Sequence, residues 1–350
     1  MRNEEALIGS CLHALGNQEG AAPPQVVLFL NNTTDRTART ARAAAACAPM
    51  HLTILEHDLR PAEQTAGHAR RRAMQAAAEL ATPHTVLFCT DADGRVARDW
   101  LAANLYHIRH GADAVAGRAL IDPADAAAIP AALHEADARE CAYSAVLDQL
   151  ASLIDPDPAD PWPRHTEHSG ASICVTRDAY MRAGGVPAVS LGEDRAFFEA
   201  LRRIDARIRH APEVCVTVSG RVVGRAKGGM ADTIRRRMVA PDPFIDDALE
   251  PAWDRLRRLR LRRRLREARA DSTLLAGLST ELCLPMARLL GAMRLPAFGA
   301  AWAAVEEGSP TLAVRPVPAA ELHLELARAV RLRDALLQTG EPEPELAAAD

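Results

Sequence analysis

The chain has 350 residues, of which 48% are hydrophobic and 25% are charged, and its formal net charge at pH 7 is −4. This composition is typical of a folded globular protein and excludes a wholly disordered chain, a collagen-like repeat and a protein with many membrane spans. Because the net charge is slightly negative, no global basic field points to nucleic acid, and we expect no nucleic-acid partner.

Strands and helices alternate in the first part of the chain. Short apolar, β-branched runs predict strands at 25–30, 51–55, 85–90 and 113–120, and helices are predicted between them at 33–47, 61–80 and 97–109. This alternation predicts an α/β fold with a doubly wound, mostly parallel sheet. Ligands of such sheets bind beyond the carboxyl ends of the strands.

The alternation is interrupted at residues 122–165, where an Ala-rich helix (130–153) leads into a Pro-rich loop (155–163). It returns with strands at 170–176 and 213–219 and helices near 178–183 and 193–204. Beyond residue 231 the pattern is helical up to an acidic tail. We therefore expect an α/β domain over residues 1–230 and a helical region over 231–350.

The cysteines and the two ends of the chain indicate where in the cell the protein is expected. The seven cysteines are widely spaced and form no CxxC motif, which predicts reduced core thiols in a cytosolic protein. The first residues carry acids where a signal peptide carries a basic and then an apolar segment. The longest apolar stretch near the C-terminus, 295–305, is 11 residues long, and a spanning helix needs about 20. We expect a cytoplasmic protein, with peripheral attachment to the inner membrane surface as the alternative.

Two carboxylates follow the strand predicted at 85–90. In an extended chain, alternate residues point to the same side, so Asp91 and Asp93 are expected on one side of the strand's carboxyl end. Two acids there can hold a divalent cation that neutralises a pyrophosphate. The alternative is an ordinary turn, because Asp and Gly94 are common turn residues.

A second acidic pair opens the helix predicted at 193–204. Ser190 and Glu193 have the spacing of a capping box, which accounts for Glu193. Asp194 lies in the first turn, where the helix dipole favours its ionised form. A rigidly held carboxylate of this kind can act as a general base. A purely structural role at the helix start is the alternative.

Two basic segments are also candidates. Arg221, Arg225 and Lys227 lie among glycines in the loop 219–229, which can wrap a diphosphate or be a solvated basic loop. Nine arginines alternate with leucines over residues 255–269. This segment can touch anionic lipid or nucleic acid, or it can be a solvated helix face packed on the body through its leucines.

Together, and in this order, these motifs resemble the family 2 glycosyltransferases, which have the GT-A fold. RNEE (2–5) resembles the end of that family's opening strand and the start of its first helix, and NNTTDRT (31–37) resembles its nucleobase and ribose turn. GHAR (67–70) resembles the helix over the nucleotide, and Asp91-Ala92-Asp93 matches the DxD metal motif. Residues 170–186 resemble the acceptor-side strand and glycine turn, and Glu193-Asp194 matches the catalytic acidic pair.

The resemblance implies an inverting transfer of one sugar from a nucleoside-diphosphate sugar to a small-molecule or lipid acceptor. It implies Mg²⁺ or Mn²⁺ on Asp93 and Asp91, and catalysis by Asp194 with Glu193. The nucleotide would be held by a further set of residues: Asn31, Asp35, Arg70, Asp91, Arg221 and Arg225.

The chain also departs from the family pattern. Leu30 or Asn31 stands where the family usually has an Asp for the base, which leaves the nucleotide open. The QxxRW motif of processive members is not found, which favours transfer of single sugars, and Ser219 and Arg221 occupy a stretch where some relatives have a third metal ligand, a histidine. Two other functions stay open at this point: a sugar-phosphate nucleotidyltransferase and a non-catalytic nucleotide-binding scaffold.

The beginning of the chain carries a further prediction. In the family, a buried strand precedes the RNEE segment and lies inside the sheet, and here Met1 falls where that strand should be ending. A central strand is paired on both sides, and each unpaired buried backbone group costs roughly 1–3 kcal/mol. We therefore expect the natural protein to begin some ten or more residues upstream. The alternatives are a locally rearranged sheet and an inactive truncated form.

Overall fold

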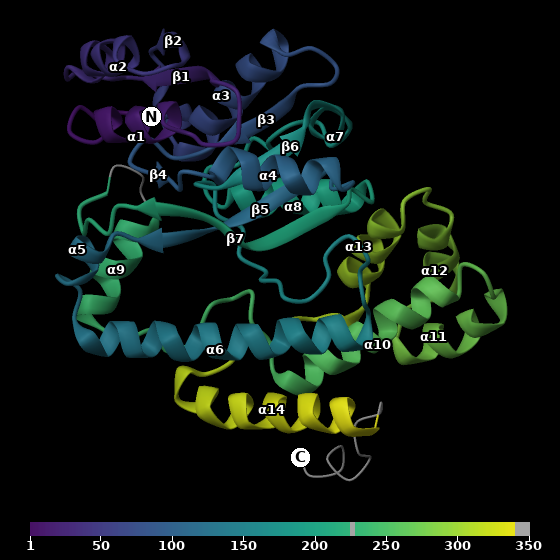
Figure 1. Cartoon of the computed structure of the whole chain (residues 1–350). Helices are drawn as coiled ribbons and strands as arrows, with labels where there is room; N and C mark the ends of the chain where they lie inside the picture. The colour runs from purple at the N-terminus through teal and green to yellow at the C-terminus, as the bar shows by residue number, and fades with distance from the viewer. Residues whose placement is uncertain (225–227, 340–350) are drawn as a thin grey trace. The chain divides into compact units, whose positions relative to one another are not determined.

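The computed structural model describes residues 1–224 and 228–339 and divides into two compact units. The first unit comprises residues 1–129, 167–202 and 206–236. The second comprises residues 130–166, 203–205 and the chain from 237 onward. The labels below follow Figure 1.

The first unit contains two sheets. Strands β1 (Gln25–Asn31) and β2 (His51–His57) pair in parallel. Five strands form the other sheet in the order β3-β6-β5-β7-β4. Their bounds are β3 Val86–Cys89, β4 Arg95–Val96, β5 Ala114–Ile121, β6 Ile173–Thr176 and β7 Ile208–Val218. β5 and β7 are parallel, whereas β3 and β5 run antiparallel to β6, and β4 runs antiparallel to β7.

The α/β class predicted from the sequence is confirmed, and the antiparallel ladders were not predicted. They arise because β6 returns to the sheet after the excursion at 130–166 and lies between β3 and β5. Beside β1, the Met1 amino group donates to the Phe29 carbonyl at 2.8 Å, and the Asn31 N–H donates to the Met1 carbonyl at 2.9 Å. The expectation of an upstream strand stays a prediction.

Helices cover the sheets of the first unit (Figure 1). They are α1 Ile8–Gly16, α2 Thr37–Ala46, η1 Pro61–Glu63, α3 Ala66–Leu80, α4 Trp100–Arg109, α5 Pro123–Ala126, α7 Arg177–Arg182, α8 Glu193–Arg203 and α9 Met230–Val239, the last running across the boundary of the unit. The helix predicted at 61–80 is broken before Ala66, where the Thr65 hydroxyl accepts from the His68 N–H and starts α3.

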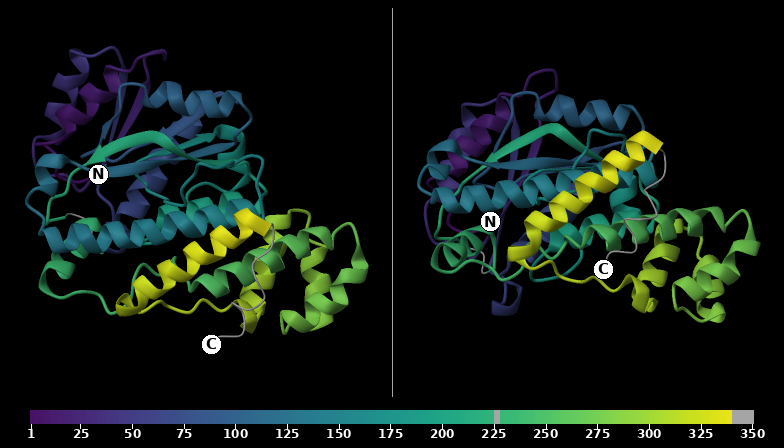
Figure 2. Two further views of the ribbon diagram at one scale, coloured as in Figure 1. Left: turned by 60° about the horizontal axis from the view of Figure 1, so that its bottom comes forward. Right: turned by 90° about the horizontal axis from the view of Figure 1, so that it is seen from below.

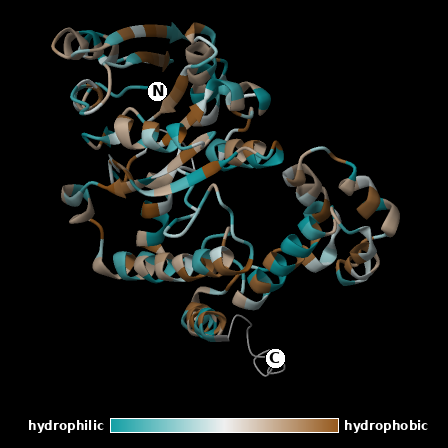
Figure 3. Cartoon of the chain, turned by 45° about the vertical axis from the view of Figure 1, so that its right-hand side comes forward, coloured by the Kyte–Doolittle hydropathy of each residue, from teal (hydrophilic) through white to brown (hydrophobic). Residues whose placement is uncertain are grey.

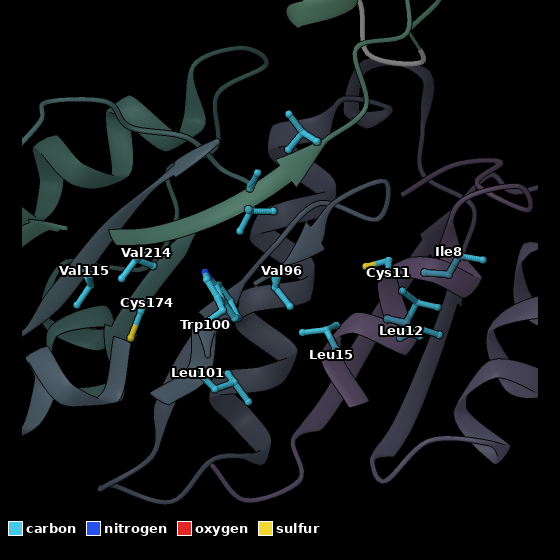
Figure 4. Close-up of a cluster of buried hydrophobic side chains, with 14 of the residues drawn as sticks. Ile8, Cys11, Leu12, Leu15, Val96, Trp100, Leu101, Val115, Cys174 and Val214 are labelled. Atoms are coloured by element: carbon cyan, nitrogen blue, oxygen red, sulfur yellow. The ribbon is translucent and has the colours of Figure 1, made fainter. Parts of the chain in front are cut away.

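The largest core cluster of this unit joins both sheets through α1 and α4 (Figure 4). Ile8 and Leu12 of α1 are buried with Trp100 of α4 and Val214 of β7. The Trp100 indole N–H donates to the Ser172 hydroxyl at 2.9 Å, which satisfies the one polar atom of this side chain. This cluster fixes the strand ends after which the candidate site residues follow.

The second unit is helical. Its elements are α6 Ala131–Ile154, α10 Ala252–Glu267, η2 Ser272–Leu274, α11 Leu275–Glu281, α12 Met286–Met293, α13 Phe298–Gly308, η3 Pro310–Leu312, η4 Ala319–Glu321 and α14 Leu322–Thr339. α14 packs along α6 (Figure 2), and buried residues of both helices share one cluster with Leu256 and Leu259 of α10. Hydrophobic and hydrophilic residues are interleaved along these helices (Figure 3).

The division into domains at residues 1–230 and 231–350 stays a prediction. The two compact units assign the residues of the chain in more detail. The first unit ends near the expected boundary, at Arg236. Residues 130–166 lie with the C-terminal helices, because the apolar side of α6 (Tyr143, Leu147 and Leu150 among others) is buried against α10 and α14. Within the described residues, no helix is both long enough and apolar enough to cross a membrane.

Candidate active site

Asp91 and Asp93 follow β3 directly, as the sequence predicts. The strand ends at Cys89, and the Gly94 N–H donates to the Asp91 carbonyl at 3.0 Å, which closes a tight turn around the pair. Each carboxylate is paired with a different arginine. Asp91 accepts from Arg70 at 2.8 Å, and Asp93 lies 3.0 Å from an Nη2 of Arg221. The turn predicted as one alternative is therefore present, and the metal-binding role of the two carboxylates stays a prediction.

Arg70 of α3 connects the two acidic motifs. Its Nη2 bonds Asp91, and its Nε bonds the Glu193 carboxylate at 2.9 Å. Its Nη1 donates to the Cys89 thiol at 3.1 Å and to the Gly170 carbonyl. Burial alone would lower the pKa of Arg70, but Asp91, Cys89 and Glu193 raise it above its ordinary value. The guanidinium is thus a fixed positive charge between the end of β3 and the start of α8.

Two glycines permit this close approach. A Cβ on Gly170 would lie 2.2 Å from Nη2 of Arg70, so only glycine leaves room for the guanidinium at that position. A Cβ on Gly67, one turn before Arg70, would lie 2.3 Å from the Val189 carbonyl oxygen in the loop before α8. The start of α3 can therefore lie directly against that loop.

Glu193 and Asp194 begin α8, where the sequence places them. The Glu193 side chain is 7% exposed and is held by Arg70. The Asp194 carboxylate is half-buried and accepts from the Gly170 N–H at 3.0 Å and from the Arg195 N–H at 2.8 Å. Gly170 thus bonds Arg70 through its carbonyl and Asp194 through its amide. This shared residue brings Asp91, Arg70, Glu193 and Asp194 together in one network.

Arg221 forms a second network with an acid that the sequence analysis did not single out. Its Nη1 and Nη2 donate to the two carboxylate oxygens of Glu4 at 2.9 and 2.8 Å, and the same Nη2 contacts Asp93. Burial raises the pKa of Asp93 to about 6, the neighbouring Asp91 and Glu4 act in the same direction, and Arg221 opposes the shift. Only the resemblance of RNEE to a strand end marked Glu4, and no local motif signals its ion pair with a residue 217 positions away.

The residues predicted to hold the nucleotide differ in their burial and in their bonding partners. Asn31 is buried at the end of β1. The Asp35 carboxylate accepts from the Thr37 N–H at 3.0 Å and from the Glu5 N–H at 3.1 Å, so it fixes the start of α2 against the N-terminal segment. Arg70 and Arg221 are bound to carboxylates, as described above. Arg225 lies outside the described residues.

The donor set fits a hard divalent cation. Asp91 and Asp93 supply carboxylate oxygens, the ligands that Mg²⁺ and Mn²⁺ prefer. The buried hydroxyl of Thr90, next to Asp91, has no hydrogen-bond partner among the described residues. Within that part of the chain, no group of three or more His, Cys, Asp or Glu is arranged to hold a metal ion.

The arginine-rich segment 255–269 is largely paired within its own unit. Arg262 and Arg266 bond the buried Asp155, Arg258 bonds Glu250 and Glu306, and Arg264 bonds Glu281. The leucines between them, Leu256, Leu259, Leu261 and Leu265, are buried. The interpretation as a helix packed through its leucines fits these contacts, and the four arginines named here each have an acidic partner.

The comparisons with known proteins point to one family. Residues 1–148 match the family described as Glycosyl transferase family 2. No curated protein matches the chain. This family match supports glycosyl transfer and favours neither of the two other functions left open by the sequence.

Solved structures give looser likenesses. The mannosyltransferase PcManGT from Pyrobaculum calidifontis, in complex with GDP-Man and Mn²⁺, is 20% identical, with a TM-score of 0.45 over 94% of this chain and 85% of that chain. TarS of S. aureus is 14% identical, with a TM-score of 0.45 over 88% of this chain and 54% of that chain. TarS 1–349 in complex with UDP gives 14% identity and a TM-score of 0.43, over 88% of each chain. At these values the structures assign no substrate to this chain.

Proposed function

We propose that this chain, whose residues 1–148 match Glycosyl transferase family 2, moves a single sugar from a nucleoside-diphosphate sugar to an acceptor hydroxyl with inversion at the anomeric carbon. The observation that carries the proposal is the Arg70 network, which ties the metal-type acid Asp91 to the helix start bearing Glu193 and Asp194. A donor diphosphate and an acceptor hydroxyl need groups of these two kinds within one site.

Asp194 is the proposed general base. Its carboxylate is half-buried and is held by two backbone N–H groups, which keep it at the start of α8. It would take the proton of the acceptor hydroxyl while the acceptor oxygen forms a bond to the anomeric carbon. The bond from that carbon to the diphosphate oxygen would break, and its electron pair would leave with the diphosphate. Attack in line with the leaving group gives inversion.

Asp93 and Asp91 would hold Mg²⁺ or Mn²⁺. When bound, such an ion supplies positive charge that offsets the charge of the leaving diphosphate. Arg70 keeps Asp91 and Glu193 in place from its buried position. Glu193 would then act by positioning Arg70 and the start of α8, next to the reacting Asp194.

Asn31 and Asp35 would border the nucleoside, and Arg221 and Arg225 would contact the diphosphate. In support, Asp35 and Glu4 tie the N-terminal segment to α2 and to Arg221, respectively, within the first unit. The acceptor would be a small molecule or a lipid. We propose a cytoplasmic location, which the seven free cysteines support. Contact with a membrane surface has little support, because arginines of α10 are paired with acids.

A thermal-shift panel tests the donor class. UDP-, GDP- and dTDP-sugars are compared with and without Mn²⁺, with ATP as the nucleotide control. A ligand that binds only the folded state at a hundredfold excess over its Kd stabilises it by about 2.7 kcal/mol. We expect at least one nucleoside-diphosphate sugar to raise Tm more in the presence of Mn²⁺. The proposal fails if no member of the panel shifts Tm under either condition.

A further inference from the structure

Arg221 shares one guanidinium between two acids. Both of its terminal nitrogens donate to Glu4, at 2.9 and 2.8 Å, and Nη2 also lies 3.0 Å from Oδ2 of Asp93. The Glu4 side chain is 7% exposed and that of Asp93 is 19% exposed. The bidentate pair with Glu4 fixes the orientation of the guanidinium and leaves Nη2 directed at Asp93 as well.

The two arginines of the site differ in how firmly they are held. Arg70 is 10% exposed and bonds four different residues. The Arg221 side chain is 27% exposed, and Glu4 and Asp93 are its ion-pair partners. If one guanidinium nitrogen changes its partner, fewer contacts are therefore disturbed at Arg221 than at Arg70.

We propose that Arg221 is the counter-ion of Asp93 in the metal-free protein, that Glu4 is the positioning residue that holds it there, and that a divalent cation and Arg221 compete for Asp93. This inference rests on the proposed function, because it takes Asp93 as a metal-binding carboxylate. A carboxylate oxygen in direct contact with a guanidinium offers less of its charge to a second cation. Binding of the cation would free the N–H of Arg221 Nη2 that faces Asp93, while Nη1 and Nη2 both stay bonded to Glu4.

The freed N–H group of Arg221 can bind an anion at this site. An arginine held on one side by Glu4 presents its free N–H groups to an anion without losing its position. A diphosphate oxygen is such an anion. Cation binding and diphosphate binding would therefore assist each other through Arg221, and the free protein would have a low intrinsic affinity for the metal.

The test is a Mn²⁺ titration followed by electron paramagnetic resonance, without nucleotide, on the full chain. Arg221→Met removes the competing charge, and Arg221→Gln removes the charge but keeps a donor for Glu4, in case the methionine variant does not fold. Arg207→Met is the control of equal charge change, because Arg207 is 60% exposed and pairs with Asp113 away from these acids. Asp93→Asn and the double variant Asp93→Asn/Arg221→Gln complete the cycle. Each folded state is checked by circular dichroism.

We expect both Arg221 variants to bind Mn²⁺ about tenfold more tightly than the wild type, equivalent to about 1.4 kcal/mol, and Arg207→Met to bind as the wild type does. The gain should vanish in the double variant, because it acts through Asp93. Unchanged affinity in both Arg221 variants, or a gain that persists without Asp93, overturns the inference while leaving the proposed function intact. If none of these proteins binds Mn²⁺, even with UDP or GDP added, both the inference and the metal role in the proposed function fail.

Discussion

Arg70→Met should strongly destabilise the first unit. The variant keeps a side chain of similar length and removes the charge that faces Glu193 at 2.9 Å and Asp91 at 2.8 Å. Asp91 is 41% exposed and can be hydrated, whereas Glu193 is 7% exposed and would be left as a buried, unpaired charge. Removing one partner of a buried pair typically costs about 3–5 kcal/mol, or roughly 6–20 °C in Tm for a domain of about 150–250 residues.

Urea unfolding monitored by circular dichroism measures this loss. Arg36→Met is the matched control, because Arg36 is 74% exposed and its pair with Glu5 should be worth less than about 1 kcal/mol. Adding Glu193→Gln to Arg70→Met removes the charge that was left behind and should restore part of the stability. A loss below about 1 kcal/mol in Arg70→Met, or no recovery in the double variant, would refute the view that Arg70 balances a buried charge.

Three further predictions concern other parts of the molecule. Gly170→Ala places a Cβ 2.2 Å from Nη2 of Arg70 and should cost about 1–3 kcal/mol in the free energy of unfolding, with much less effect in an Arg70→Met background; equal losses in both backgrounds would contradict the contact. Burial raises the pKa of Asp148 to about 6, so the neutral carboxyl is favoured by the fold, and stability present at low pH is lost as pH rises from about 4 to about 6, by up to roughly 3 kcal/mol. Asp148→Asn should therefore have a higher Tm than the wild type at pH 8 and a similar Tm at pH 4, and a lower Tm at pH 8 would reverse the argument. Because the arginines of α10 are paired with acids such as Asp155 and Glu250, the protein should float poorly with vesicles containing anionic lipid even at low salt, and strong flotation would show that these charges are available to lipid.

Local patterns were sufficient to predict most elements of the first unit. β1 and β2 carry apolar, β-branched runs, and the structure places them within two residues of their predicted ends. β4 was missed because it has two residues and exists only through its pairing with β7. β7 begins at Ile208, earlier than expected, because the segment with Arg209, His210 and Pro212 lacks a strand pattern and is extended by its pairing with β5.

The motifs of the site could be predicted from the sequence, whereas the ion pairs that link them could not. Asp91, Asp93, Glu193 and Asp194 stand out because each pair directly follows a strand or opens a helix. The link between them was not predictable, since Arg70 and Glu193 are 123 residues apart and Arg221 and Glu4 are 217 apart. Both arginines were candidates for holding the nucleotide, but nothing in the local sequence indicates which acids they face, and only the folded chain shows it.

In the proposed reaction, the acceptor hydroxyl loses its proton to Asp194, the general base. The decisive measurement is the steady-state rate of sugar transfer by Asp194→Asn, made beside calorimetric titration of the same variant with the donor nucleotide and Mn²⁺. We predict a loss in kcat on the order of 10²–10⁴-fold with donor affinity close to that of the wild type. A variant that keeps a near wild-type kcat would contradict the account, because Asp194 would then serve only to hold Gly170 at the start of α8.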